Sequence, residues 1–464
     1  MNLWSSVRPG RCASNCQKPK YFFALGLCSL LLFNILGATK TNIPTMSNLE
    51  LFVDVITAII IILIVTQVFG TLITYIGQPK VVGEMISGVL LGPTCFGYFC
   101  PELSAEVFGK HVMPSLFILS NLGLSIYMFL VGAEMDLKLF DKKSMKQSGL
   151  LSTVAVLTPF ALGLIAGKMY SDIFAMPDIT FTSLSIFLGT ALAITAFPMM
   201  ARILQEKKFL KTKIGVIIML SASIQDVISW ILLAFVTAMA QKKGISTGFI
   251  TLIGAFVFIT LVIAVIKPIM KRIGDYTESK GKMSSIGFSV IIILLLVCAL
   301  TTDHLGLYSV FGGFILGLAM PRGAIFQAEL HSKLKDITVV LLLPLFFTYS
   351  GLNANMLVLG NMTYLTPTLV IVVFAFVSKY VSALLAMKAT GFTWRESSAM
   401  GGLTNARGLM ELIVANIGLM YFVINKELYS ILILVAILTT LAAMPIYNLS
   451  MRGKAPKSNE PIQV

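Results

Sequence analysis

The chain has 464 residues, of which 57% are hydrophobic and only 12% are charged. A soluble globular domain carries about 25% charged residues, so this composition excludes an ordinary soluble protein and indicates a polytopic helical membrane protein. The net charge of +14 is compatible with nucleic-acid binding. Most basic residues, however, fall in loops assigned to one side of the membrane, as the positive-inside rule predicts. We therefore expect a lipid bilayer and no nucleic acid as partner.

Fourteen apolar stretches are long enough to cross a bilayer, which takes about 20 residues. They are residues 21–38, 49–73, 80–98, 111–134, 149–168, 180–204, 213–240, 246–270, 283–301, 305–320, 336–356, 362–387, 396–421 and 428–450. The basic loops place both termini in the cytoplasm. The expected fold class is an all-α, multi-pass membrane protein with 13–14 transmembrane helices, in the plasma membrane or a bacterial inner membrane.

The first stretch has two interpretations. It is short and follows several basic residues, which also fits a signal peptide, but no small-residue cleavage motif follows it, so we favour a retained helix. The predicted organisation is therefore a basic segment with this extra helix or signal peptide (1–48), a transmembrane domain (49–450) and a short cytoplasmic tail (451–464). No loop is long enough for a nucleotide-binding domain, so an ion gradient is the expected source of energy.

Two stretches carry glycine, proline and polar residues at mid-depth. Residues 180–204 include FLGTALAITAFPMMARIL, and residues 396–421 include SSAMGGLTNARGLMELIVANIG. Irregular backbone is tolerated in a bilayer only where protein or a water-filled cavity satisfies it, and paired interrupted helices mark the sites of transporters. The two stretches are seven spans apart and so run in opposite directions, which predicts inverted repeats matching 149–240 to 362–450. Alternatively, these residues are simply common in membrane helices.

Asp226 lies in the apolar stretch that directly follows the first interrupted one. A carboxylate at bilayer depth costs roughly 2.5–3.5 kcal/mol on insertion scales, so we expect it to face a cavity and to bind a charge. Burial disfavours the charged form of the carboxylate, so a proton and a metal cation would compete for it. Competition at a site that opens alternately to each side yields exchange. The adjacent Gln225 can orient the ion or the carboxylate but cannot carry a proton.

Other polar residues are expected to complete this site. Thr195 in the first interrupted stretch, and Thr404 and Asn405 in the second, would add oxygen ligands to backbone carbonyls that the interruptions free. Lys379 precedes the second interruption and is expected to compensate charge across the crossing. The alternative for Lys379 is a side chain that reaches the inner surface of the membrane.

Three further charged residues are expected to hold the fold. Arg407 and Glu411 are spaced i, i+4, which places them on one helical face and predicts an ion pair. Glu84, in QPKVVGEMISGVLLGP, is expected to supply or share the counter-charge of Arg407.

Cysteine and histidine form no metal-binding pattern. Cys95 and Cys100 share an outer loop, where a disulfide and two free thiols are equally compatible with the sequence. The histidines are scattered over loops, so we expect no zinc site and no catalytic residue.

Five segments resemble the monovalent cation:proton antiporter superfamily, which has the sodium/hydrogen exchanger fold. They are QPKVVGEMISGVLLGP, FLVGAEMDL, ITAFPMMARIL, PLFFTYSGLNAN and TNARGLMELIVANIG. The resemblance covers about residues 49–450 and is greatest to the branch of Kef-type potassium efflux systems and plant cation/proton exchangers.

This resemblance implies a homodimer with two crossed discontinuous helices. Core helices near 149–240 and 362–450 would move as an elevator against a scaffold. It also implies that Asp226 binds cation and proton in turn, and that Gln225 occupies a position where relatives carry Asp, Asn or Gln. Sodium-selective relatives often have Ser or Thr four residues before the aspartate, where this chain has Ala222. The choice between K⁺ and Na⁺ is therefore left open.

The predicted function is secondary antiport of K⁺ or Na⁺ against H⁺. The chain is not expected to be an enzyme, and no cofactor is expected beyond the transported ions. A Kef-like gated potassium pathway and a sodium-coupled solute symporter are the alternatives, although no carbonyl-filter motif such as TVGYG supports a channel. An intramembrane aspartyl protease would need a second acid opposed to Asp226, which the sequence does not offer.

Overall fold

The structure is a computed structural model that describes residues 47–134, 142–177, 179–206, 212–240 and 244–452. Its α-helices are α2 (Asn48–Tyr75), α3 (Lys80–Leu91), α4 (Phe96–Phe99), α5 (Pro101–Val107), α6 (Met113–Glu134), α7 (Lys142–Met169), α8 (Ser171–Phe174), α9 (Phe181–Ala193), α10 (Phe197–Glu206), α11 (Lys213–Ala240), α12 (Gly244–Leu261), α13 (Lys267–Lys280), α14 (Ser285–His304), α15 (Ser309–Leu318), α16 (Ala324–Ile337), α17 (Leu343–Leu352), α18 (Met362–Ala389), α19 (Trp394–Thr404), α20 (Leu409–Met420) and α21 (Lys426–Met451). Two π-helical turns, η1 (Val262–Ile266) and η2 (Thr338–Leu342), and one 3₁₀ turn, η3 (Met356–Gly360), complete the set.

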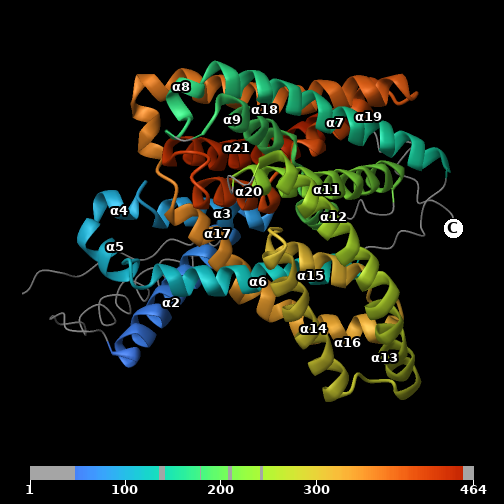
Figure 1. Ribbon diagram of the computed structural model, residues 1–464. Coiled ribbons are helices and arrows are strands. Elements are labelled where there is room, and N and C mark those ends of the chain that lie inside the picture. Colours follow the sequence, from blue (N-terminus) through green and yellow to red (C-terminus); the bar gives the residue numbers. More distant parts are fainter. Residues whose placement is uncertain (1–46, 135–141, 178, 207–211, 241–243, 453–464) are drawn as a thin grey trace, which may run out of the picture. The chain divides into compact units, whose positions relative to one another are not determined.

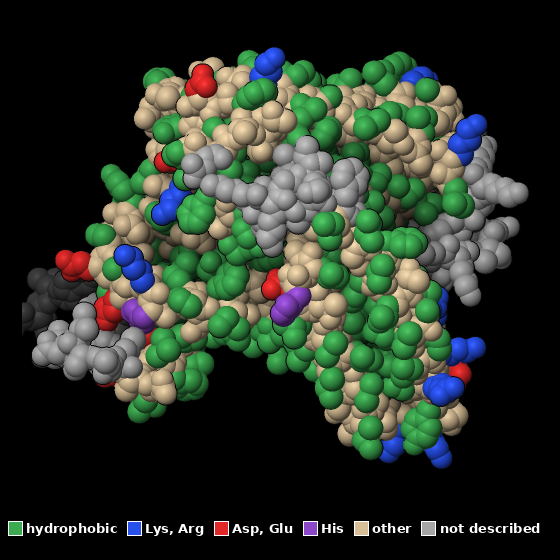
Figure 2. Space-filling model, in the orientation of Figure 1, with side chains coloured by type: hydrophobic (Ala, Val, Ile, Leu, Met, Phe, Trp, Pro, Cys, Tyr) green, Lys and Arg blue, Asp and Glu red, His purple; other side chains and the backbone are tan. Residues whose placement is uncertain are grey.

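Ten helical segments in the described ranges are long and apolar enough to cross a membrane. The three remaining predicted spans in these ranges are formed by shorter helices: α9 with α10, α15, and α19 with α20. Hydrophobic side chains cover most of the face in Figure 2, and Lys and Arg lie mainly along its margins. The all-α membrane fold class is thus confirmed, while the stretch 21–38 lies outside the described residues.

The site lies in the compact unit that begins at Asp54. Within that unit α7 packs against α9, α11 and α18, whereas α6 packs against α15 and α17. In Figure 1, α7 and α18 run side by side, with α9, α20 and α21 next to them. The α7–α9 approach depends on small residues, because a Cβ at Gly163 would lie 2.5 Å from the Cα of Gly189.

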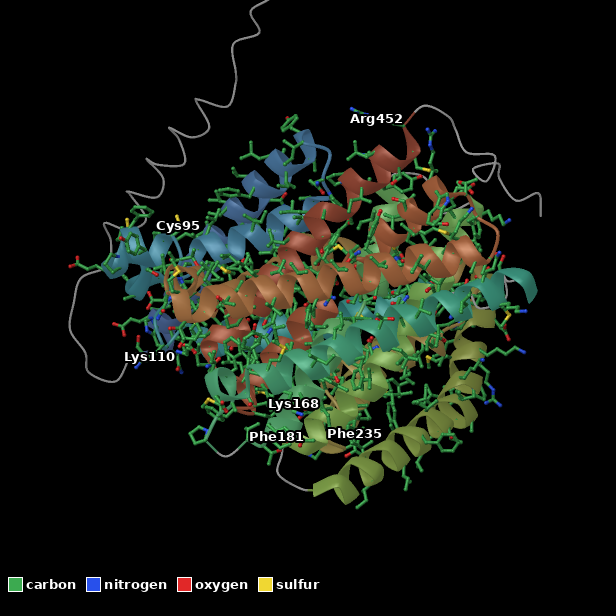
Figure 3. All side chains as sticks on the ribbon, turned by 90° about the horizontal axis from the view of Figure 1, so that it is seen from above. Cys95, Lys110, Lys168, Phe181, Phe235 and Arg452 are labelled. Carbon is green, nitrogen blue, oxygen red and sulfur yellow. The ribbon has the colours of Figure 1, made fainter. Side chains whose placement is uncertain are left out.

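Helices α7 and α9 form an antiparallel pair. Figure 3 shows Lys168, near the end of α7, beside Phe181, the first residue of α9, and Arg452 well away from both. This pairing brings α9 back through the unit and positions its C-terminal end in the interior.

Both predicted interruptions are present. Helix α9 ends at Ala193, and α10 begins at Phe197, after three intervening residues. Helix α19 ends at Thr404, and α20 begins at Leu409 after Gly408. The two interruptions meet, because a Cβ at Gly408 would lie 2.5 Å from the Cε of Met199 in α10. A side chain at this position would have to displace the flexible end of Met199, and the φ of +157° at Gly408 is itself unfavourable for any other residue.

Two helices lie largely between predicted spans. Residues 266–283 contain α13, and residues 321–336 contain α16. Each helix joins its neighbouring span through a π-helical turn. The predicted spans did not include these helices, because apolar periodicity marks only the part of a helix that lies in lipid, whereas Lys, Glu and Leu are good helix formers in water as well.

Candidate functional site

Asp226 lies on α11 with 0% of its surface exposed. Neither carboxylate oxygen makes a hydrogen bond of ordinary geometry within the described part of the chain. The neighbouring donors are the backbone N–H of Phe197 and the indole of Trp230. Phe197 is the first residue of α10, so the carboxylate faces the positive end of a half-helix. A buried acid with both oxygens unbonded is available to take up a cation or a proton.

Gln225 starts a chain of hydrogen bonds that leads away from Asp226. The Thr195 hydroxyl donates to Gln225 Oε1 over 2.6 Å. Lys379 Nζ donates in turn to Thr195 Oγ1 over 2.6 Å and also to the backbone carbonyl of Ile194. Three of the predicted site residues, from α11, the first interruption and α18, are thus brought into direct contact, beside Asp226.

This series of hydrogen bonds also extends to α7 through Ser221 and Ser152, which were not among the predicted site residues. Gln225 Nε2 donates to Ser221 Oγ over 2.8 Å, and Ser152 on α7 contacts the same hydroxyl at 3.1 Å. Trp230 is the other neighbour that was missed. Serine and tryptophan are common in membrane helices, so their presence alone did not mark them. The signal that could have identified them was spacing: Ser221 lies four residues before Gln225, and Trp230 lies four residues after Asp226.

Arg407 lies at the second interruption and binds the end of the first broken helix. Its guanidinium donates to the carbonyls of Ala191 (3.2 Å), Leu192 (2.7 Å) and Ala375 (3.1 Å). It also pairs with Glu411 at 3.1 Å, and both side chains are buried. One side chain therefore joins both broken helices and α18, which is the geometry of a structural cross-link.

These contacts change the expected ligand set. The last carbonyls of α9, which were expected to be free for a cation, accept from Arg407 and Lys379 instead. The positive side chains neutralise the negative end of that helix. Lys379 forms no ion pair with Asp226 among the described residues, and the two are linked only through Thr195 and Gln225.

The remaining predicted ligands lie at the end of α19. The Thr404 hydroxyl donates to the Gly401 carbonyl over 2.8 Å, and the Asn405 amide donates to the same oxygen over 3.0 Å. Asn405 Oδ1 has no hydrogen-bond partner in the described ranges, and the Thr404 hydroxyl, which acts as a donor, also keeps its acceptor lone pairs. Within the described part of the chain, no hydrogen bond connects either residue to Asp226 or Gln225.

The counter-charge that Glu84 is expected to supply or share for Arg407 stays a prediction. Glu84 is buried in α3, and the ion pair that the structure records for Arg407 within the described ranges is made with Glu411. Cys95 and Cys100 are both free thiols.

No cluster of three or more His, Cys, Asp or Glu residues that could hold a metal ion occurs in the described part of the chain. A cation at Asp226 would therefore meet a single carboxylate, supplemented by neutral oxygens.

Comparisons with known proteins agree with this architecture. The model of the family "Sodium/hydrogen exchanger, transmembrane" matches residues 58–446. The Na⁺/H⁺ antiporter NhaS4 of Synechocystis is 35% identical over 84% of this chain and 95% of its own length. The K⁺/H⁺ antiporter 1 of Saccharomyces cerevisiae and the cation/H⁺ antiporter 18 of Arabidopsis thaliana are 29% and 34% identical over 84% of this chain. The chain spans about half the length of these two relatives, 45% and 48%.

A solved structure has the same fold. The sodium proton antiporter MjNhaP1 of Methanocaldococcus jannaschii matches 86% of this chain and 98% of its own with a TM-score of 0.54, at 15% identity. The extent of the family match and the identity to NhaS4 establish the relationship: the chain belongs to the transmembrane sodium/hydrogen exchanger family.

Proposed function

We propose that this protein exchanges a monovalent cation, K⁺ or Na⁺, for a proton across a membrane, and that Asp226 binds the two ions in turn. The observation that carries the proposal is the state of this carboxylate: it is fully buried, and both oxygens are unbonded at the end of a half-helix. An unpaired buried acid is retained in a membrane protein where it serves an ion pathway.

The competition between ions follows from the number of acidic groups. Gln225, the neighbour of Asp226, is neutral and already donates to Ser221 and accepts from Thr195. A single carboxylate cannot hold a proton and a cation on the same oxygens at once. Each transport cycle therefore carries one cation one way and one proton the other, and we expect the exchange to be electroneutral.

The remaining features of the function follow the same proposal. Relatives include proteins named for Na⁺/H⁺ and for K⁺/H⁺ antiport, so both cations are candidates here. We propose that the protein forms a homodimer in a plasma or bacterial inner membrane with its C-terminus in the cytoplasm. We further propose that α7–α11 and α18–α21 form the moving core, and that no cofactor takes part besides the transported ions.

The test is reconstitution into vesicles that contain a pH-sensitive dye. Na⁺, K⁺, Li⁺ and Rb⁺ gradients are applied in turn to the wild type, to Asp226→Asn and to the control Asp303→Asn, which removes an exposed acid at the end of α14. We expect the wild type and the control to move protons in response to K⁺ or Na⁺, and Asp226→Asn to be as inactive as empty vesicles. Exchange by folded Asp226→Asn at the wild-type rate would overturn the proposal.

A further inference from the structure

Trp230 lies one helical turn after Asp226 on α11, and its side chain is buried, with 4% exposure. Its indole nitrogen has no hydrogen-bond partner within the described residues. Buried indole N–H groups normally find an acceptor, so an unbonded one calls for an explanation.

The acceptor it lacks is adjacent. Asp226 has two unbonded oxygens, and the Trp230 indole is the side-chain donor within interaction range of them. Residues four apart on a helix share a face. A donor and an acceptor, each buried and each unbonded, therefore face each other on α11 without the short contact of a formed hydrogen bond.

The opposite side of the indole is held by another helix. The ring lies 5.4 Å from Phe311 and 6.4 Å from Phe314, centroid to centroid, and is stacked on the second. Both phenylalanines belong to α15, which packs on α6 rather than among the helices of the interrupted repeats. This aromatic contact fixes the ring plane and so the direction in which the N–H can point.

We propose that Trp230 is a positioning residue for the ion-binding carboxylate, an inference that rests on the proposed exchange function. Its N–H donates to Asp226 when the site is empty and ionised, and releases the oxygen when a cation binds. Indole is a donor without an acceptor, so it stabilises the negative, empty carboxylate most strongly and competes with the cation for the oxygens of Asp226. Trp230 thus lowers the affinity of the site and lets the bound ion leave.

The first experiment removes the N–H and keeps an aromatic ring. Trp230→Phe and the wild type are compared in vesicles by the initial rate of exchange against K⁺ or Na⁺ concentration at fixed alkaline pH. We expect the apparent KM of Trp230→Phe to fall about 3- to 10-fold, because the carboxylate has lost a competing donor. Trp394→Phe, which changes an exposed indole at the start of α19, should leave KM unchanged. A purely structural role for the ring would instead lower the maximal rate at unchanged KM, and that result would overturn the proposal.

The second experiment measures the contact without relying on transport. The chain has three tryptophans, so Trp4→Phe/Trp394→Phe leaves Trp230 as the only indole. We expect its emission to change when K⁺ or Na⁺ is added to the purified protein, and to change with pH even without these cations. The chain with only Trp394 should show neither response, and Asp226→Asn should abolish both in the chain with only Trp230.

The two experiments separate the inference from the function beneath it. If the wild type exchanges no cation, the proposed function fails, while a pH response of Trp230 that depends on Asp226 would still support the pairing. If exchange occurs but KM is unchanged in Trp230→Phe, or if the emission of Trp230 responds to neither ion, the proposal for Trp230 is wrong and the function stands. Should Trp230→Phe fail to fold, the emission titration decides alone.

Discussion

Both interrupted helices have buried charged side chains beside the interruption, but these charges are paired differently at the two places. At the second interruption, the buried charges of Arg407 and Glu411 are paired with each other, and the guanidinium also binds three backbone carbonyls. At the first interruption, Lys379 is bonded to Thr195 and Ile194, but Asp226 is left with both oxygens unbonded. At the second interruption the charged side chains are paired with each other, whereas at the first interruption Asp226 remains available to bind an ion.

The difference shows how a membrane protein can be stable and still bind an ion reversibly. A carboxylate that is fully paired cannot accept a new ion without losing its partner, and a buried pair that loses one member is strongly destabilised. The cross-link at Arg407 holds the two broken helices together. Asp226 can therefore remain unpaired, and the transported ion can bind to it without breaking an existing ion pair.

The largest effect on stability is expected for Arg407→Met. This change leaves Glu411 buried without its partner and removes one donor from each of three carbonyls, of which that of Ala375 still accepts from the Ser378 hydroxyl. The free energy of unfolding should therefore fall by about 3–5 kcal/mol. Thermal unfolding in detergent measures this. Because Glu411 is the group left unpaired, Arg407→Met/Glu411→Leu should recover part of the loss. A double variant less stable than Arg407→Met would contradict the pairing of the two side chains.

A smaller effect is expected for Lys379→Met. The variant loses the donor to Ile194 and Thr195, and we expect the free energy of unfolding to fall by about 1–3 kcal/mol. Because Lys379 is not paired with Asp226, exchange should persist at a reduced rate per folded molecule. It should also stay independent of an imposed membrane potential, measured with a clamped K⁺ diffusion potential. A voltage-driven rate in the wild type that disappears in Lys379→Met would show that Lys379 takes part in the charge movement.

The smallest effect compares one threonine from each interruption. Thr195→Val removes the link between Gln225 and Lys379, and a lost hydrogen bond worth about 1 kcal/mol corresponds to a rise of about fivefold in apparent KM for the cation. Thr404→Val removes a hydroxyl that bonds only within its own helical turn, so KM should change less than about twofold. Equal effects of the two substitutions would mean that both interruptions contribute ligands.

Much of the fold could be predicted from the sequence, because a lipid bilayer restricts the length and composition of the segments that cross it. Apolar stretches of sufficient length located every span in the described residues, and the glycine and polar residues of 180–204 and 396–421 located both interruptions. The helical extensions α13 and α16 were missed, because their sequences are amphipathic and polar rather than continuously apolar.

The site was readable only in part. Asp226, Lys379, Arg407 and Glu411 stand out because charges are rare in apolar stretches. The pairing of Arg407 with Glu411 follows from their i, i+4 spacing. The other partners of Arg407 and Lys379 do not stand out, since most of them are backbone carbonyls, which every residue has. Which carbonyls are free depends on the residue at which α9 ends, and that is set by packing rather than by a motif. The expected role of Glu84 stays a prediction, because the sequence carries no signal of its distance to Arg407.

The most direct test of the central claim is a count of protons released when a cation binds. Purified protein in weakly buffered detergent solution is titrated with K⁺ or Na⁺ while the solution pH is recorded, at a pH where Asp226 is protonated in part of the molecules. If one carboxylate serves both ions, binding of each cation to a protonated site releases one proton, and the release disappears in Asp226→Asn. Proton release that persists in folded Asp226→Asn, or cation binding to the wild type without proton release at any pH, would contradict the account.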